Sequence, residues 1–126
     1  MGPAPDKISR MIHISMVSQK DLVLVDFPFS DLQRSKVRPV IIISNNNYNS
    51  VFSDVIAVPV TSNPNARDFT ICISNKDLAN GYLPVDSKIK VDRVFSVDKS
   101  LIRRTVGQVN DNIHKQIVDI LVGLIR

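Results

Sequence analysis

Six short runs rich in β-branched residues constrain the fold of this chain more than any other feature of its sequence. Turn-forming residues such as Asn, Ser, Asp and Pro separate the runs, and this arrangement is typical of strands joined by tight connections. Strands this short and numerous predict an antiparallel barrel or sandwich. The runs cover residues 22–29, 37–44, 54–62, 69–74, 89–97 and 102–109.

The periodicity changes after residue 110. Apolar residues then recur on one helical stripe, and either Asn110 or Asp111 can cap the N-terminus of the helix. We therefore expect one amphipathic C-terminal helix that seals the barrel or packs against a second copy of itself. Between the strands we expect turns at 44–53 and 80–81, and one helical turn at 76–80. The stripe consists of Ile113, Ile117, Ile120, Leu121 and Leu124.

Length and composition limit the class of protein. A chain of 126 residues suits one domain, and its net charge of +4 favours polyanionic partners. The longest wholly apolar run, residues 40–43, is far too short to cross a bilayer. Residues 1–19 lack the sustained apolar core of a signal peptide. We expect them to form a flexible N-terminal extension before a domain at 20–126, in a cytoplasmic protein.

The reactive side chains exclude several kinds of site. With only His13, His114 and one cysteine, a catalytic zinc site is not expected. Apolar neighbours predict that Cys72 is a buried structural thiol, and we expect His114 at the surface of the helix. The sequence has neither a glycine-rich phosphate-binding motif nor a serine-centred hydrolase motif. We expect no metal and no cofactor.

Cations and hydroxyls remain as candidates for chemistry. Arg38 stands directly before Pro39 where a loop becomes a strand, and a guanidinium grips phosphate through a planar fork of donors. Two basic segments would form a trough if the fold brought them together; the alternative is that they carry scattered solubilising charges. The first contains Arg34, Lys36 and Arg38, and the second contains Lys88, Lys90 and Arg93.

Three segments, in order, resemble the MazF/PemK/Kid family of toxin endoribonucleases. VLVDFPFSDLQRSKVRPVIIIS is similar to the family's opening strand, loop, Arg-Pro and apolar strand. IAVPVTS resembles its second landmark. DSKIKVDRVFSVDKSLI resembles the segment with a basic residue and a carboxylate two apart. The resemblance covers about residues 20–126.

This resemblance implies an SH3-like small barrel, a MazF/CcdB-like antiparallel sheet with a C-terminal helix, that forms a homodimer. It implies the toxin of a type II toxin-antitoxin system, an mRNA interferase that cleaves single-stranded RNA sequence-specifically and without metal. The 2′-hydroxyl would attack the adjacent phosphate, leaving a 2′,3′-cyclic phosphate and a 5′-hydroxyl. The implied partners are RNA and an antitoxin with a disordered tail. The alternatives are a CcdB-like poison of DNA gyrase and a noncatalytic RNA-binding module.

The resemblance also implies roles for residues. Arg38 would bind the scissile phosphate, Thr61 would donate to a phosphoryl oxygen, and Ser62 would assist. Asp92 matches a carboxylate proposed as general base, and Lys90 stands where relatives carry Arg; the alternative for Asp92 is an ion pair with Arg93 or Lys90. The first loop lacks the histidine of some relatives. We expect Arg34 and Lys36 to bind RNA, and bases to stack on Phe29, Tyr48 or Tyr82, unless these aromatics only pack.

Overall fold

The computed structural model describes residues 17–28 and 35–126. Five of the six predicted strands are present as single strands, with bounds shifted by one or two residues at several ends. Phe29 and Arg34 lie outside the described residues, as does the rest of the loop between the first two strands. The strands are β1 (Asp21–Pro28), β2 (Ser35–Ile42), β3 (Asp54–Thr61), β4 (Thr70–Ile73), β5 (Leu78–Gly81), β6 (Ser87–Lys90), β7 (Phe95–Asp98) and β8 (Ile102–Val109).

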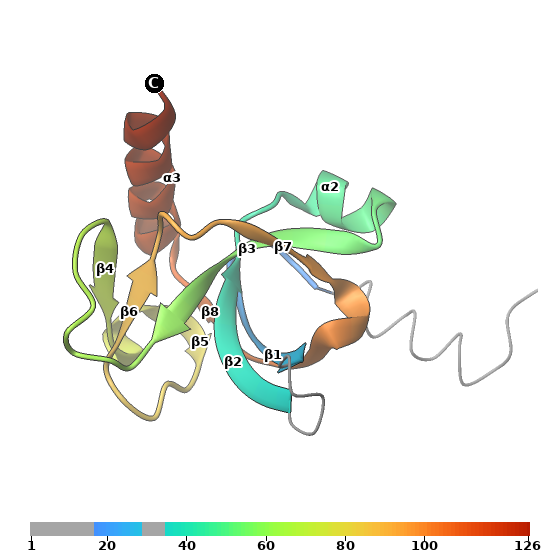
Figure 1. Cartoon of the computed structure of the whole chain (residues 1–126), viewed down its shortest axis with the longest axis horizontal. Coiled ribbons are helices and arrows are strands. Elements are labelled where there is room, and N and C mark those ends of the chain that lie inside the picture. The colour runs from blue at the N-terminus through green and yellow to red at the C-terminus, as the bar shows by residue number, and fades with distance from the viewer. Residues whose placement is uncertain (1–16, 29–34) are drawn as a thin grey trace, which may run out of the picture.

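These strands form one antiparallel sheet in the order β4-β6-β3-β2-β1-β8-β5, with β7 also paired to β3. The sheet curls strongly, and helix α3 (Asp111–Ile125) stands against one end of it (Figure 1). The predicted class is thus confirmed as a mainly β, curled half-barrel with a C-terminal helix.

Strand β3 organises the curl because its two halves have different partners on one side. Its first half pairs with β7, and its last residues, Val60 and Thr61, pair with β6. The predicted single strand at 89–97 is therefore wrong: it divides into β6 and β7, with a turn between them in which the Arg93 amide donates to the Lys90 carbonyl. Two short partners let the sheet bend away from β3 in two directions.

Both faces of the central strands are buried, and this explains their continuous apolar character. On β1, Leu22 joins one core cluster while Val23 and Val25 join the other. The first cluster includes Ile113 and Ile117 of α3, so the predicted helical stripe does seal the sheet. Asn110 caps this helix by accepting from the Ile113 amide. Leu124, by contrast, is 39% exposed.

Four elements differ from the predicted turns and helical turn. The expected turn at 44–53 contains helix α2 (Asn46–Val51), which the Asn45 side chain caps. The expected helical turn at 76–80 divides into the 3-10 helix η1 (Asn75–Asp77) and strand β5. A second 3-10 helix, η2 (Lys99–Leu101), carries the buried Lys99, which donates to the Asn49 carbonyl of α2.

The prediction for Cys72 is wrong. On β4, Ile71 and Ile73 point into the core, and the alternation of a strand turns Cys72 outward, where it is exposed.

The residues before β1 contact the domain from position 17 onward. Val17 is buried in the second core cluster, and the Gln19 amide donates to Asn46. Among the helices of the described residues, none is long and apolar enough to span a membrane.

Candidate functional site

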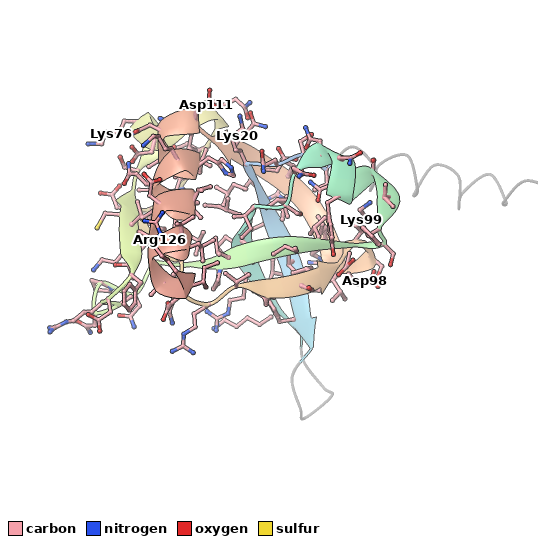
Figure 2. The ribbon with its side chains drawn as sticks, turned by 90° about the horizontal axis from the view of Figure 1, so that it is seen from above. Lys20, Lys76, Asp98, Lys99, Asp111 and Arg126 are labelled. Atoms are coloured by element: carbon pink, nitrogen blue, oxygen red, sulfur yellow. The ribbon has the colours of Figure 1, made fainter. Side chains whose placement is uncertain are left out.

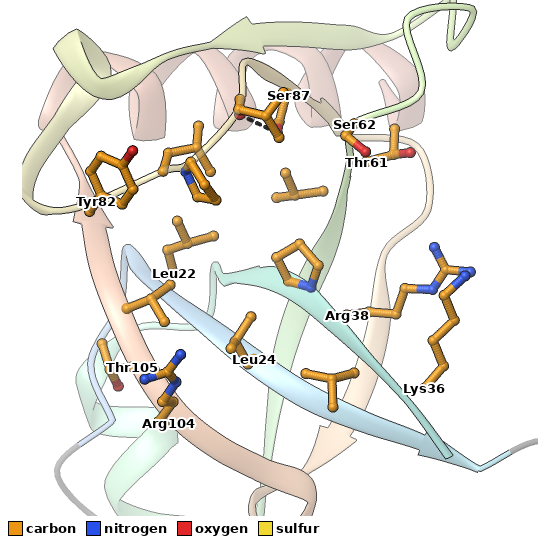
Figure 3. Close-up of a pocket in the computed structure, with 17 residues that line it drawn as sticks. Leu22, Leu24, Lys36, Arg38, Thr61, Ser62, Tyr82, Ser87, Arg104 and Thr105 are labelled. Carbon is orange, nitrogen blue, oxygen red and sulfur yellow. Dashed lines mark hydrogen bonds between the residues drawn. The ribbon is translucent and has the colours of Figure 1, made fainter. Parts of the chain in front are cut away.

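A groove of about 790 Å³ lies over the face of the sheet formed by β1, β2, the end of β3 and β8. The segment that joins β5 to β6 forms its far wall (Figure 3). Its floor is apolar because alternate residues of neighbouring strands, such as Leu22, Leu24 and Pro39, face the same side. Polar groups stand at its ends: Lys36, Arg38, Thr61 and Ser62 at one, and Tyr82, Arg104 and Thr105 at the other.

The β2 end of the groove carries two cations. Lys36 and Arg38 are exposed, and alternation puts both on the same side of β2. Arg38 makes no ion pair with any carboxylate in the described part of the chain. Among the described residues no carboxylate neutralises its guanidinium, and the planar fork of donors on that group fits phosphate.

Two hydroxyls lie opposite these cations. Thr61 is the last residue of β3, and its Oγ1 accepts from the Asn63 amide at 3.1 Å. A hydroxyl that accepts this bond keeps its own proton to donate. Ser62 follows it as an exposed residue at the same rim. The groove therefore brings together four of the sequence-predicted residues from two strands: Lys36, Arg38, Thr61 and Ser62.

Lys90 and Asp92 do not line this groove. Lys90 ends β6 and is paired with Thr70 of β4. Asp92 lies in the following turn and borders a shallow cleft with Phe27, Pro59 and Phe95. Its carboxylate is 3.9 Å from the Arg93 guanidinium, which is the ion pair considered as an alternative role. Pro59 is two residues before Thr61 on β3, so the cleft and the groove adjoin the same strand.

The predicted stacking residue Tyr48 lies on α2, outside the groove. Its ring packs on Phe52 with centroids 4.6 Å apart, and its hydroxyl donates to Asp54 at 3.3 Å. Burial and the Asp54 carboxylate raise the pKa of Tyr48 above its ordinary value. Phe29 and Arg34 lie outside the described residues.

Sequence reasoning did not select Arg104 and Thr105. Arg104 and Thr105 belong to the predicted strand at 102–109, but the register of β8 against β1 shifts twice. Counting alternate residues along the sequence cannot reveal which side chains face the groove across such bulges. Tyr82, which was predicted as a residue on which a base could stack, does line the groove, and it follows β5, which was not predicted as a strand.

The prediction that His114 lies at the surface is wrong: the imidazole is half-buried, and its Nδ1 atom is buried with no hydrogen-bond partner among the described residues. Nearby, the Lys20 ammonium lies 2.6 Å from the Asp111 carboxylate, joining the start of the sheet to the start of α3 (Figure 2). Burial first, and then Lys20, lower the pKa of His114, while Asp111 acts in the opposite direction. Within the described residues, no three His, Cys or acidic side chains form a metal-binding group.

Known proteins with this fold give the class. Residues 18–124 match the model of the family described as PemK-like, MazF-like toxin of type II toxin-antitoxin system. The chain belongs to this family, the MazF family of endoribonucleases (mRNA interferases). No curated protein sequence matches the chain.

Solved structures agree with the family. The chain is similar to MazF in a MazE-MazF crystal structure from Deinococcus radiodurans, with 21% identity and a TM-score of 0.71 over 86% of this chain and 94% of that one. It is similar to an endoribonuclease in complex with its cognate antitoxin from Mycobacterial species, with 19% identity and a TM-score of 0.66 over 85% and 90%. It also resembles the Mycobacterium tuberculosis toxin MazF-mt6, with 16% identity and a TM-score of 0.64 over 82% and 93%. These likenesses establish a common fold.

Proposed function

We propose that this chain is the toxin of a type II toxin-antitoxin system and that it cleaves single-stranded RNA, without metal and at particular sequences. The observation that carries the proposal is the common groove of Arg38 and Thr61, two residues far apart in the sequence. Both are residues for which the family resemblance implies a role at the scissile phosphate. Family membership supplies the reaction class, and the groove supplies cations and hydroxyls suited to phosphoryl transfer.

In the proposed reaction, the 2′-oxygen of a ribose attacks the adjacent phosphorus. A new P–O2′ bond forms and the P–O5′ bond breaks, which leaves a 2′,3′-cyclic phosphate and a 5′-hydroxyl. RNA supplies its own nucleophile, so no serine or cysteine nucleophile is needed. Arg38 binds the phosphate and stabilises the charge that builds on its non-bridging oxygens. The Thr61 proton donates to one of those oxygens, and Ser62 assists.

Two proton transfers accompany these bond changes, and one of the two candidate groups, Asp92, lies in the neighbouring cleft and not in the groove. Asp92 is the candidate base that takes the 2′-proton, and Arg38 is the candidate acid for the 5′-oxygen. Lys90 contributes positive charge, but as a point charge it holds phosphate less rigidly than Arg. Asp92→Asn tests the assignment: an unchanged cleavage rate in a folded variant makes Asp92 structural, through its contact with Arg93.

The proposed partners follow from the family and from charge. The related Mycobacterial endoribonuclease was solved with its cognate antitoxin, and the Deinococcus MazF with MazE. We propose that a cognate antitoxin with a disordered, acidic tail covers the basic end of this groove, where Lys36 and Arg38 lie. We further propose a homodimer that acts in the cytoplasm, where mRNA is found.

The experiment is incubation of the purified chain with single-stranded RNA in excess EDTA, followed by analysis of the fragment ends. Fragments that end in 2′,3′-cyclic phosphate and begin with 5′-hydroxyl support the proposal. Binding without cleavage supports an RNA-binding module instead, and DNA breaks that depend on gyrase support a gyrase poison. Loss of cutting in EDTA that added Mg²⁺ restores contradicts the metal-independent mechanism.

A further inference from the structure

The end of the groove remote from Arg38 carries a second set of polar groups that the proposed reaction does not use. Tyr82 stands on the wall, and Arg104 and Thr105 stand on β8, across β1 from the β2 end (Figure 3). The apolar floor connects the two ends without interruption, because Leu22, Leu24 and other apolar residues line the space between them. One extended ligand can therefore contact both ends.

The register of the sheet separates the two ends by a defined amount. Leu24 of β1 is paired with Pro39 of β2 on one side and with Arg104 of β8 on the other. Two strand spacings put the Cα atoms of Pro39 and Arg104 about 10 Å apart. Since Arg38 precedes Pro39, the two guanidinium groups approach the groove from opposite sides of its floor. In Figure 3 the Arg38 and Arg104 side chains stand at opposite ends of the floor, so each guanidinium can bind a different phosphate of one strand.

Arg104 is available for an anion, whereas its neighbour is not. The Arg103 guanidinium lies 3.1 Å from the Asp26 carboxylate, but Arg104 makes no ion pair with any carboxylate in residues 17–28 and 35–126. Both arginines are exposed residues of one strand. Arg103 is therefore a matched control for the charge of Arg104.

Tyr82 is exposed, but its backbone is held firmly. Tyr82 is 67% exposed at the groove wall, and its backbone amide donates to the Val106 carbonyl at 3.2 Å. The preceding Gly81 has φ +90°, and a Cβ there would lie 2.2 Å from the Cα of Gly107. This close approach fixes β5 against β8, so it holds the backbone of Tyr82 at a defined place at the same end of the groove as Arg104 (Figure 3).

An exposed aromatic ring, a free guanidinium and an apolar floor together suit a nucleotide better than they suit a simple anion. A base can stack on the ring because every base has a π-face, and the guanidinium can bind the phosphate attached to it. We propose that Tyr82 and Arg104 form a second nucleotide subsite, which holds a base and a phosphate flanking the scissile one. The choice of RNA as the ligand of this subsite rests on the proposed function. With the subsite occupied, the protein binds more of the RNA than the two nucleotides that flank the scissile phosphate.

The test measures binding of a fluorescent octanucleotide of deoxyuridine, which has no 2′-hydroxyl and cannot be cut by the proposed reaction. Affinity is followed against salt concentration. Each phosphate contact contributes about 0.7 to the slope of log affinity against log salt for single strands. We expect Arg104→Gln to lower that slope by about 0.7, Arg103→Gln to leave it unchanged, and the Arg38→Ala, Arg104→Gln double variant to lower it by about 1.4.

Tyr82 is tested by affinity at one salt concentration. We expect Tyr82→Ala to weaken binding by about ten- to a hundredfold without altering the slope, and Tyr82→Phe to bind as the wild type does, because the phenyl ring still stacks. Thermal melts of every variant confirm that it is folded. If Tyr82→Phe is as weak as Tyr82→Ala, the stacking role is wrong.

Three outcomes overturn the subsite. In the first, Arg104→Gln has the same salt slope as Arg103→Gln. In the second, the slope of the double variant falls by only about 0.7, which means that both arginines bind the same phosphate. In the third, the Tyr82 and Arg104 variants change the molar mass in light scattering while the affinity for the octanucleotide stays constant. These binding results do not depend on catalysis. If the wild type fails to cut RNA, the proposed function fails while the subsite stands or falls on the slopes.

Discussion

At the scale of single residues, the groove depends on side chains whose donors remain available after folding. Thr61 is the clearest case, because its oxygen accepts from the Asn63 amide and its proton remains available to donate. Its position at the end of β3 and its place in IAVPVTS made it predictable from sequence. The free guanidinium of Arg104 was not predictable, since its availability depends on a bulged register that turns Arg103 towards Asp26.

Replacing the Thr61 hydroxyl separates its chemical role from its shape. We expect Thr61→Val to remain folded, at a cost of about 1 kcal/mol for the lost bond from Asn63, and to cut RNA about a hundredfold more slowly. Thr61→Ser keeps the donor and should retain most of the activity. Rates measured on one labelled RNA test this, and equal rates for Thr61→Val and the wild type would remove Thr61 from the mechanism.

His114 gives the stability a pH dependence whose sign follows from its surroundings. Burial lowers its pKa below the ordinary 6.5, so the unfolded chain binds more protons than the folded protein as the pH falls through that value. The free energy of unfolding should therefore be highest above about pH 7 and decrease as the pH falls from there to the lowered pKa. Below that pKa both states are protonated, and this contribution stays constant.

The control for this prediction is His114→Gln, which removes the titrating group. Urea unfolding at a series of pH values should show a flatter profile in this variant as the pH falls below about 7. Asp111 stays ionised at these pH values, because Lys20 lowers the pKa of its carboxyl group below the ordinary 3.8. A wild-type profile that is already flat, or that rises as the pH falls, would contradict the role of His114.

At the scale of elements, local patterns predicted the strands and the terminal helix, but not every partner. The apolar runs of β1, β2 and β3 and the helical stripe of α3 arise from burial, which the sequence pattern records directly. β5 has only four residues and three of them are exposed, so it carries no apolar pattern. The break between β6 and β7 depends on β3 having two partners on one side, which is a property of the sheet and not of the segment.

The junction of β5 and β8 should be sensitive to one methyl group. Gly81 combines φ +90° with a backbone contact that leaves no room for a Cβ, so Gly81→Ala should lower the free energy of unfolding by at least about 2 kcal/mol. Gly123 is the matched control: it lies in α3, nothing lies within 4 Å of a Cβ there, and Gly123→Ala should raise stability by about 0.5–1 kcal/mol. Urea unfolding of both variants tests the pair, and equal effects would contradict it.

At the scale of the whole molecule, one face of α3 stays exposed although it is apolar. The sheet covers Ile113 and Ile117, while Val118, Val122 and Leu124 are each about 40% exposed and Ile125 is 84% exposed. A single chain does not cover this surface. Assembly was predicted from the family resemblance, because no periodicity in the sequence distinguishes a stripe that seals a sheet from one that also meets a partner.

We expect the purified protein to be a homodimer. Light scattering at micromolar concentration should give twice the 14.1 kDa mass of one chain. The same measurement on Val122→Lys, which places a charge on the exposed face of α3, reports whether this face forms the dimer interface. A wild-type mass of one chain at that concentration would contradict the dimer.

The central claim is that the groove between β2 and the end of β3 cuts RNA through Arg38, and one measurement tests it most directly. The rate of cleavage of a single-stranded RNA in EDTA is compared for the wild type, Arg38→Ala and Arg103→Gln, each shown to be folded by thermal melting. We predict that Arg38→Ala is slower by about tenfold to a thousandfold, as expected for losing one transition-state donor, while Arg103→Gln keeps the wild-type rate. Cleavage by Arg38→Ala at the wild-type rate would contradict the account.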